Sequence, residues 1–370
     1  MIRSRTATFA LFPVLMVSWA TSQNAGKRPS LPTGHLTPGH DMTSARGGHT
    51  AKILPNFKVF IAGGKNERGS VLASTEVYDP TTETFSPGTK MSIPREGLAA
   101  ASLADGKILI AGGATRGGIP LSSCEVYDYE TEKFTTRGSM HARRVRPTAI
   151  VLRDGRVLLI GGQDGSQSLD SAETYDLLTG KWKLVGKMSF ARVGHTATLL
   201  ADGRVLVVGG TGNQHSVLAS AEIFDPKSNQ FSRSGDLHQA RSMQTDALLP
   251  DGKVLIAGGA GDTKATVPLA STELFDPATN SFSVSGSMTE PRMKLPDAAL
   301  LLDGRILLVG GERSAEIYDP RTVTSRPVLG NLDTARYNSA AIQLMDGSSR
   351  IFGGYDASGV STAKSWVYRP

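Results

Sequence analysis

The sequence predicts an all-β fold made of seven similar units, each with four short strands. A pair of glycines follows a run of apolar residues seven times, and the pairs begin at Gly63, Gly112, Gly161, Gly209, Gly258, Gly310 and Gly353. Self-similarity with a period near ~50 residues is typical of repeat architectures. No long stretch has the apolar spacing of an amphipathic helix. The repeats fill the chain beyond its N-terminal segment, so we expect no second folded domain.

Each unit contains four β-rich runs that are separated by turn signals. The fourth unit shows them in order: an apolar run after Arg192, the Asp202-Gly203 pair, residues 204–210, residues 220–226 and residues 230–235. Asp-Gly suits a tight hairpin, because glycine accepts a positive φ. Asp-Pro after the third run marks the next turn in several units. Four antiparallel strands per unit are therefore expected.

The first residues have the pattern of a secretory signal peptide. Arg3 and Arg5 precede an uncharged apolar run over residues 7–20, and Ser18 and Ala20 are small residues suited to cleavage after Ala20. We expect a signal peptide at 1–20, a linker at 21–33, and a secreted or periplasmic protein with no membrane span after cleavage. Cys124 is the single cysteine, which excludes an intramolecular disulfide and cysteine-rich zinc sites. The net charge of +6 is modest, and no nucleic-acid partner is expected.

The repeated units resemble the kelch repeat, and this resemblance implies a seven-bladed β-propeller over residues 34–370. It rests on the glycine pairs, on a Glu-x-Tyr/Phe-Asp sequence in the third run, and on an aromatic residue in the fourth run. That aromatic residue is Phe85, Phe134, Trp182, Phe231 or Phe282. Galactose-oxidase-like enzymes contain propellers of this kind, so the resemblance extends to their central domain.

The two ends of the chain indicate how the ring closes. The last unit stops in its third run, at Trp366–Pro370, whereas residues 34–46 match a fourth strand and its linker. We expect the N-terminal strand to complete blade seven, which would remove an exposed sheet edge.

An arginine before each first strand and a glutamate in the third strand recur across the units, and we expect them to form one structural ion pair per blade. The two side chains lie at the same end of a blade, about 9–10 Å apart across one strand, and the glycine pair leaves the crossing clear. The predicted structural residues are Arg46, Arg95, Arg144, Arg192, Arg241, Arg292, Glu76, Glu125, Glu173, Glu222, Glu273 and Glu316.

Positions that break the repeat are the candidates for binding. In blade seven Trp366 replaces the glutamate, so Arg336 is predicted to lack a partner. In blade six only Glu312 and Arg313 separate the glycine pair from Ser314, which predicts a notch beside blade seven. The binding candidates are Arg336, Tyr337, Asn338, Trp366, Arg313, Glu312, Arg146, Lys294 and Glu96. A solvated surface is the alternative interpretation of these side chains.

Catalytic and metal-binding motifs are absent from the sequence. The seven histidines form no closely spaced ligand pair, so no metal and no cofactor are expected. Copper oxidases that resemble galactose oxidase need a Tyr crosslinked to Cys and a Tyr-His dipeptide, and the sequence lacks that dipeptide. A kelch-type mutarotase of sialic acid needs only one acid–base residue and one arginine, for which Glu96 with Arg146, or Glu312 with Arg336, would serve.

The sequence therefore predicts a monomeric, secreted, non-enzymatic protein that binds a protein or glycan partner on one face of the propeller. A carbohydrate-active enzyme, mutarotase-like or copper-oxidase-like, is the alternative, because fold alone does not determine activity.

Overall fold

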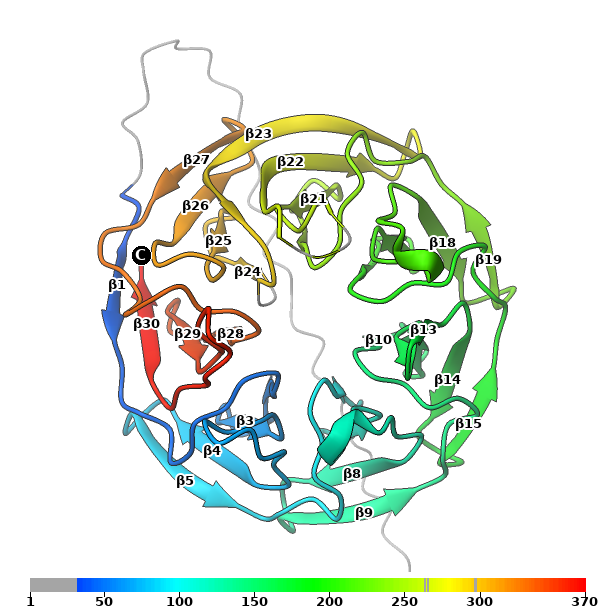
Figure 1. The fold of residues 1–370 in the computed structure, drawn as a ribbon, viewed down its shortest axis with the longest axis vertical. Coiled ribbons are helices and arrows are strands. Elements are labelled where there is room, and N and C mark those ends of the chain that lie inside the picture. Colours follow the sequence, from blue (N-terminus) through cyan, green and yellow to red (C-terminus); the bar gives the residue numbers. More distant parts are fainter. Residues whose placement is uncertain (1–31, 263, 265, 296–297) are drawn as a thin grey trace, which may run out of the picture. The chain divides into compact units, whose positions relative to one another are not determined.

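A computed structural model describes residues 32–262, 264, 266–295 and 298–370. Residues 33–370 form one compact unit, a ring of seven antiparallel four-stranded sheets (Figure 1). The predicted all-β, seven-bladed propeller is therefore confirmed. The expected signal peptide and most of the expected linker lie outside the described residues.

Blades one to three follow one another along the chain. Blade one consists of β2 (Thr50–Ile53), β3 (Val59–Ala62), β4 (Thr75–Asp79) and β5 (Thr84–Gly88). Blade two consists of β6 (Ala99–Ser102), β7 (Ile108–Ala111), β8 (Cys124–Asp128) and β9 (Lys133–Arg137), with a short 3-10 turn η1 (Arg116–Gly118). Blade three consists of β10 (Thr148–Val151), β11 (Val157–Ile160), β14 (Ala172–Asp176) and β15 (Lys181–Leu184), with a small hairpin of β12 (Gln163–Asp164) and β13 (Gln167–Ser168).

Blades four to seven repeat this order. Blade four consists of β16 (Thr196–Leu199), β17 (Val205–Val208), β18 (Ala221–Asp225) and β19 (Gln230–Arg233), with η2 (Asn213–His215). Blade five consists of β20 (Thr245–Leu248), β21 (Val254–Ala257), β22 (Leu269–Asp276) and β23 (Ser281–Arg292). Blade six consists of β24 (Ala299–Leu300), β25 (Ile306–Leu308), β26 (Glu316–Asp319) and β27 (Thr324–Pro327). Blade seven contains β28 (Ala340–Gln343), β29 (Ser349–Phe352) and β30 (Ser365–Arg369).

The N-terminal strand β1 (His35–Pro38) is the fourth strand of blade seven, as predicted. It pairs antiparallel with β30, with His35 opposite Arg369 and Pro38 opposite Trp366. Leu36 of β1 is buried in the same apolar cluster as Trp366. The first and last described strands of the propeller therefore share one sheet, which closes the ring.

The core lies between neighbouring blades. Every residue of the second strands β3, β7, β11, β17, β21, β25 and β29 is buried. The aromatic residue of the fourth strand packs on an aromatic residue of the third, with ring centroids 4.8 Å apart for Tyr78 and Phe85 and 5.2 Å apart for Tyr175 and Trp182. Burial of such large apolar surfaces is the main term that stabilises the ring.

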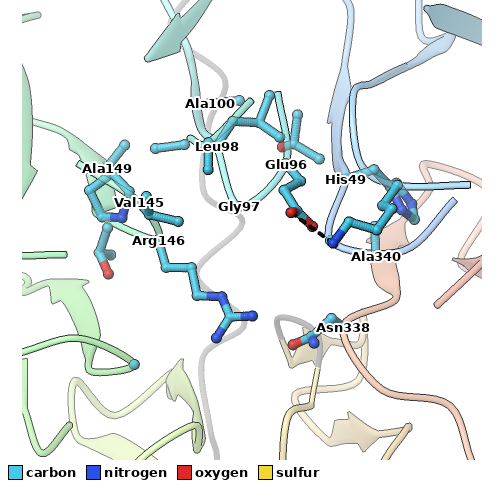
Figure 2. Close-up of a pocket in the computed structure, with 18 of the residues that line it drawn as sticks. His49, Glu96, Gly97, Leu98, Ala100, Val145, Arg146, Ala149, Asn338 and Ala340 are labelled. Carbon is cyan, nitrogen blue, oxygen red and sulfur yellow. Dashed lines mark ion pairs between the residues drawn. The ribbon is translucent and has the colours of Figure 1, made fainter. Parts of the chain in front are cut away.

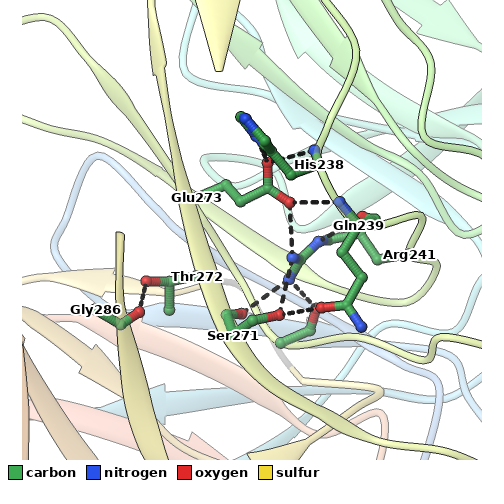
Figure 3. A network of polar contacts seen from close by, with 8 residues as sticks. His238, Gln239, Arg241, Ser271, Thr272, Glu273 and Gly286 are labelled. Carbon is green, nitrogen blue, oxygen red and sulfur yellow. Dashed lines mark hydrogen bonds and ion pairs between the residues drawn. The ribbon is translucent and has the colours of Figure 1, made fainter. Parts of the chain in front are cut away.

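The six predicted arginine–glutamate pairs are present and buried. Their N–O distances are 2.8 to 3.0 Å, and both side chains of each pair are at most 2% exposed. In Figure 3 the Arg241 guanidinium contacts Glu273 and Ser271, while Glu273 also accepts hydrogen bonds from the backbone N–H groups of His238 and Gln239. The glutamate thus fixes the linker that enters its blade, which is a structural role.

The glycine pair has a second role besides the one predicted. The second glycine donates its N–H to the carbonyl of the next blade's arginine, at 2.9 Å for Gly64 and Arg95. A Cβ on the first glycine would lie only 2.5 Å from that carbonyl oxygen, as at Gly63 and Arg95. Glycine is therefore needed for the close approach of neighbouring blades. It also leaves room for the arginine of its own blade, since a Cβ on Gly113 would lie 3.2 Å from the Cβ of Arg95.

Candidate functional site

A cavity of about 630 Å³ lies where the first strands of the blades begin. Its walls come from six blades, with Gly48 and His49 of blade one, Gly97 of blade two, Arg146 of blade three and Asn338 of blade seven among them. Because the first strands surround the central axis, this cavity is the mouth of the channel. The face predicted to bind a ligand therefore contains a concave site.

Seven equivalent positions surround this mouth, each two residues after the repeated arginine. They are Gly48, Gly97, Arg146, Gly194, Met243, Lys294 and Asn338, and all have positive φ, between 50° and 66°. Backbone hydrogen bonds of 2.7 to 3.0 Å connect them in a continuous series from Gly194 through Met243, Lys294, Asn338, Gly48 and Gly97 to Arg146. We call these seven residues the mouth ring. Their backbone forms a rigid frame from which the side chains project.

The side chains of Arg146, Glu96 and Asn338 lie around one opening (Figure 2). Glu96 forms an ion pair of 2.9 Å with Lys65, and both side chains are partly exposed. The Arg146 side chain is exposed and extends into the opening. Three of the nine predicted binding residues, which come from three different blades, therefore line the same cavity.

Four further candidates, Lys294, Tyr337, Glu312 and Arg313, lie outside the lining of this cavity. Lys294 belongs to the mouth ring, and its ammonium lies 5.7 Å from the centre of the Tyr337 ring. Burial raises the pKa of Tyr337, and the charge of Glu312 raises it further. Arg313 is exposed, and its carbonyl accepts a hydrogen bond from the N–H of Leu332. These residues belong to blades six and seven.

The prediction that Arg336 lacks a partner is wrong. Its guanidinium forms two hydrogen bonds with Asp333, of 3.0 and 2.7 Å, and lies 5.9 Å from the centre of the Trp366 ring. Arg336 and Trp366 are 6% and 2% exposed, and Trp366 belongs to the apolar cluster between blades six and seven. In blade seven the carboxylate therefore comes from the linker instead of the third strand, and the Trp366 indole occupies the position of the glutamate. Both residues belong to the interior of the blade, and the Glu312–Arg336 pair does not line the cavity.

Comparison with known proteins agrees with this repeat structure. The profile of the kelch motif matches residues 58–92, 97–141, 144–189 and 192–238, which correspond to blades one to four. The chain is a seven-bladed β-propeller, and its first four blades carry the kelch motif. No curated protein shows significant sequence similarity to this kelch protein.

A solved structure with a similar fold is a fungal alcohol oxidase of the AA5 family in complex with copper. The TM-score is 0.76 at 16% identity, and the match covers 91% of this kelch protein and 76% of the oxidase chain. Similarity at this level concerns the fold.

The described residues of this kelch protein do not fit a copper centre. Cys124 is buried, and its sulfur accepts a hydrogen bond of 3.2 Å from the Trp182 indole. Within the described ranges, no group of three or more His, Cys, Asp or Glu side chains is arranged to hold a metal ion.

No helix in the same part of the chain is long and apolar enough to cross a membrane.

Two histidines of the cavity wall are buried and uncharged. Burial, together with the neighbouring Arg46 and Arg192, lowers the pKa of His49 and of His195 to about 3. Their ring nitrogens have no hydrogen-bond partner among the described residues. They belong to blades one and four and occupy equivalent positions, three residues after the arginine. Each is packed over the first glycine of the preceding blade, Gly353 or Gly161.

The sequence-based search for site residues missed Lys65 and Tyr355. Each directly follows a glycine pair and pairs through its backbone with the residue after the repeated arginine, Gly47 or Tyr337. The Tyr355 hydroxyl donates to the Gly47 carbonyl at 2.7 Å, and burial raises its pKa well above the usual value. Comparing the seven residues after the glycine pairs would have identified this position, because it is basic, aromatic, small or polar in different blades.

Proposed function

We propose that this kelch propeller is a non-enzymatic binding protein, exported from the cytoplasm, that holds a glycan or protein partner at the channel mouth. The observation that carries this proposal is the cavity bounded by Arg146, Glu96 and Asn338. Its volume of about 630 Å³ is within the usual range for ligand sites, and polar groups from different blades converge on it.

The mouth ring combines a constant backbone with variable side chains, and this combination supports a binding role. The backbone of the mouth ring is equivalent in all blades, whereas its side chains differ from blade to blade. Rigid frames that present variable side chains are suited to recognition, because little entropy is lost when a ligand binds. The walls of the cavity are therefore preorganised for a partner.

Export is supported by the apolar N-terminal segment and the small residues before position 21. The test is the intact mass of the protein recovered from the envelope and medium of cells that express the full sequence. We expect a chain that begins at residue 21. A protein of full mass in the cytoplasm would overturn this part of the proposal.

Ligand binding is tested by the thermal midpoint of the purified chain in the presence of a panel of monosaccharides and polysaccharides. A ligand that binds the native state raises the midpoint. We expect a shift that is lost in Asn338→Ala and retained in Arg321→Ala, a change at an exposed ion pair in a β26–β27 turn. A shift that Asn338→Ala leaves unchanged would exclude the channel mouth. If no glycan produces a shift, the expected partner is a protein, and a pull-down with the same two variants tests it.

An enzyme acting on sugars is the second candidate, because Glu96 and Arg146 lie in the same cavity. A carboxylate can act as the general acid–base in the exchange of sugar anomers, and a guanidinium can hold an anionic group of the substrate. The rate of anomer exchange in the presence of the wild-type chain and of Glu96→Gln distinguishes the two functions. Acceleration that Glu96→Gln abolishes would favour the enzyme, and no acceleration supports the binding protein.

A further inference from the structure

Glycine alone would satisfy the backbone conformation at every position of the mouth ring. Gly48, Gly97 and Gly194 form the same backbone as their counterparts, with φ of 65°, 59° and 66°. Arg146 and Lys294 adopt φ of 52° and 54°, a conformation that costs an L-residue with a side chain about 1–2 kcal/mol. These two side chains are therefore not required by the ring itself. Strain of this kind is concentrated at functional sites.

The cavity wall carries an excess of positive charge. Lys52, Lys65 and Arg146 contribute three cations, whereas Glu96 is the single acid among the lining residues. Lys65 and Glu96 neutralise each other through their ion pair of 2.9 Å. Arg146 forms no ion pair and no side-chain hydrogen bond within the part of the chain that the structure describes, and its guanidinium extends into the opening (Figure 2). An anionic group in the cavity would therefore meet an unpaired guanidinium.

The surroundings of Arg146 favour a singly charged group. A phosphate dianion is usually held by several cations or by a nest of free backbone N–H groups. Here the N–H groups of Gly48, Gly97, Arg146, Met243, Lys294 and Asn338 already donate to carbonyls within the ring. One planar guanidinium instead matches a carboxylate, which it can bind through two parallel hydrogen bonds.

The remaining polar groups are suited to hydroxyls. Asn338, Gln163 and Thr50 line the same cavity and offer amide and hydroxyl groups that both donate and accept. The volume of about 630 Å³ accommodates a ligand the size of one or two sugar rings.

We propose that the channel mouth recognises a sugar acid, with the carboxylate on Arg146 and the hydroxyls on Asn338 and its neighbours. This inference rests on the proposed binding function and specifies its ligand class.

Calorimetric titration of the full chain with D-glucuronate, D-galacturonate and D-glucose tests the proposal. Glucuronate and glucose differ by one carboxylate, so their comparison isolates the charge. We expect a uronate to bind and glucose to bind at least about tenfold more weakly. Affinity for the uronate should fall as salt is added, because an ion pair that is open to solvent is screened.

Arg146→Gly is the decisive variant. It keeps the ring backbone, since three blades already have glycine there, and therefore separates loss of the guanidinium from loss of the fold. We expect it to weaken uronate binding by at least about tenfold. Val323→Gly is the matched control, because it also replaces a residue of positive φ (58°) by glycine, but in the β26–β27 turn outside the mouth ring, and we expect it to bind like the wild type.

The outcomes distinguish the sugar-acid proposal from the proposed function. Equal affinity for glucose and glucuronate, or unchanged uronate binding in Arg146→Gly, would overturn the proposal while leaving a glycan-binding mouth in place. Failure of both uronates to bind at millimolar concentration would also overturn it, and the panel and pull-down above would then decide the proposed function. Binding of inorganic sulfate as tight as that of glucuronate would indicate an adventitious anion site only.

Discussion

Asp333 supplies to Arg336 the carboxylate that a third-strand glutamate supplies in the other six blades. The Nε and one Nη of Arg336 donate to the two oxygens of Asp333, at 3.0 and 2.7 Å. Lys364 also forms an ion pair of 3.0 Å with Asp333. The acid thus lies three residues before its arginine, in the linker that enters the blade, and the pair is retained although its geometry has changed.

Removal of the arginine should cost less in blade seven than in blade four. In Arg192→Ala the Glu222 carboxylate stays fully buried, because its side chain is 0% exposed, and breaking such a pair costs about 3–5 kcal/mol. In Arg336→Ala the Asp333 side chain, 26% exposed, keeps Lys364 and gains water, so we expect a loss of about 2 kcal/mol. Denaturant unfolding of both variants measures the difference. A loss in Arg336→Ala that is indistinguishable from zero would show that Asp333 does not hold the arginine in the folded protein.

Phe57 lies in a turn whose backbone conformation is unfavourable for a residue with a Cβ. Its φ is 64° and its side chain is 55% exposed, whereas the equivalent turn residue in every other blade is a glycine, such as Gly106 or Gly252. We expect Phe57→Gly to be more stable than Phe57→Ala by about 1 kcal/mol, because alanine keeps the Cβ that opposes this conformation. The free energy of unfolding of the two variants checks this. If the alanine variant is the more stable, the turn is not strained by its side chain.

Ring closure makes the stability of the propeller depend on β1. A chain that begins at His40 lacks β1 and exposes the edge of β30, which normally pairs with residues 35–38. We expect a lower thermal midpoint and self-association through that edge, because unpaired strands recruit other chains. A chain that begins at Thr33 retains β1 and is the control. We expect it to have the thermal midpoint and the oligomeric state of the full chain. Identical behaviour of the two truncated chains would contradict the role assigned to β1.

Features that repeat in every blade were predictable from the sequence because repetition within one chain reveals them. The glycine pairs, the six ion pairs and the N-terminal strand all follow from aligning the seven units. The partner of Arg336 was missed for the same reason. Alignment shows that Trp366 replaces a glutamate, but it does not show that Asp333 in the linker accepts hydrogen bonds from the arginine instead.

The position of the candidate site could be predicted from the sequence, but not all of the residues that form it. The face of the propeller and Glu96, Arg146 and Asn338 follow from comparing variable positions near the first strands. The mouth ring was missed, because a positive φ cannot be read from an arginine or a lysine. Glycine at the same position in three blades was the available signal.

His195 should make the propeller sensitive to acid. Burial and the nearby Arg192 and Arg144 lower its native pKa to about 3, well below the usual value near ~6.5. The unfolded chain therefore binds a proton that the native chain excludes. The resulting stability is fully present above about pH 6.5 and is lost progressively as the pH falls towards about 3, at about 1.4 kcal/mol per pH unit.

His195→Gln should reduce this dependence, because blade five already has a glutamine at the equivalent position. There the Gln244 side-chain amide donates to the Val208 carbonyl at 2.8 Å. We expect the free energy of unfolding of His195→Gln to fall less steeply than that of the wild type between pH 6 and pH 4, with His35→Gln, a change at an exposed side chain of β1, as the control. Parallel curves for the wild type and His195→Gln would mean that His195 is already protonated in the native protein. A charged His195 beside the arginines would then add to the positive charge of the cavity wall.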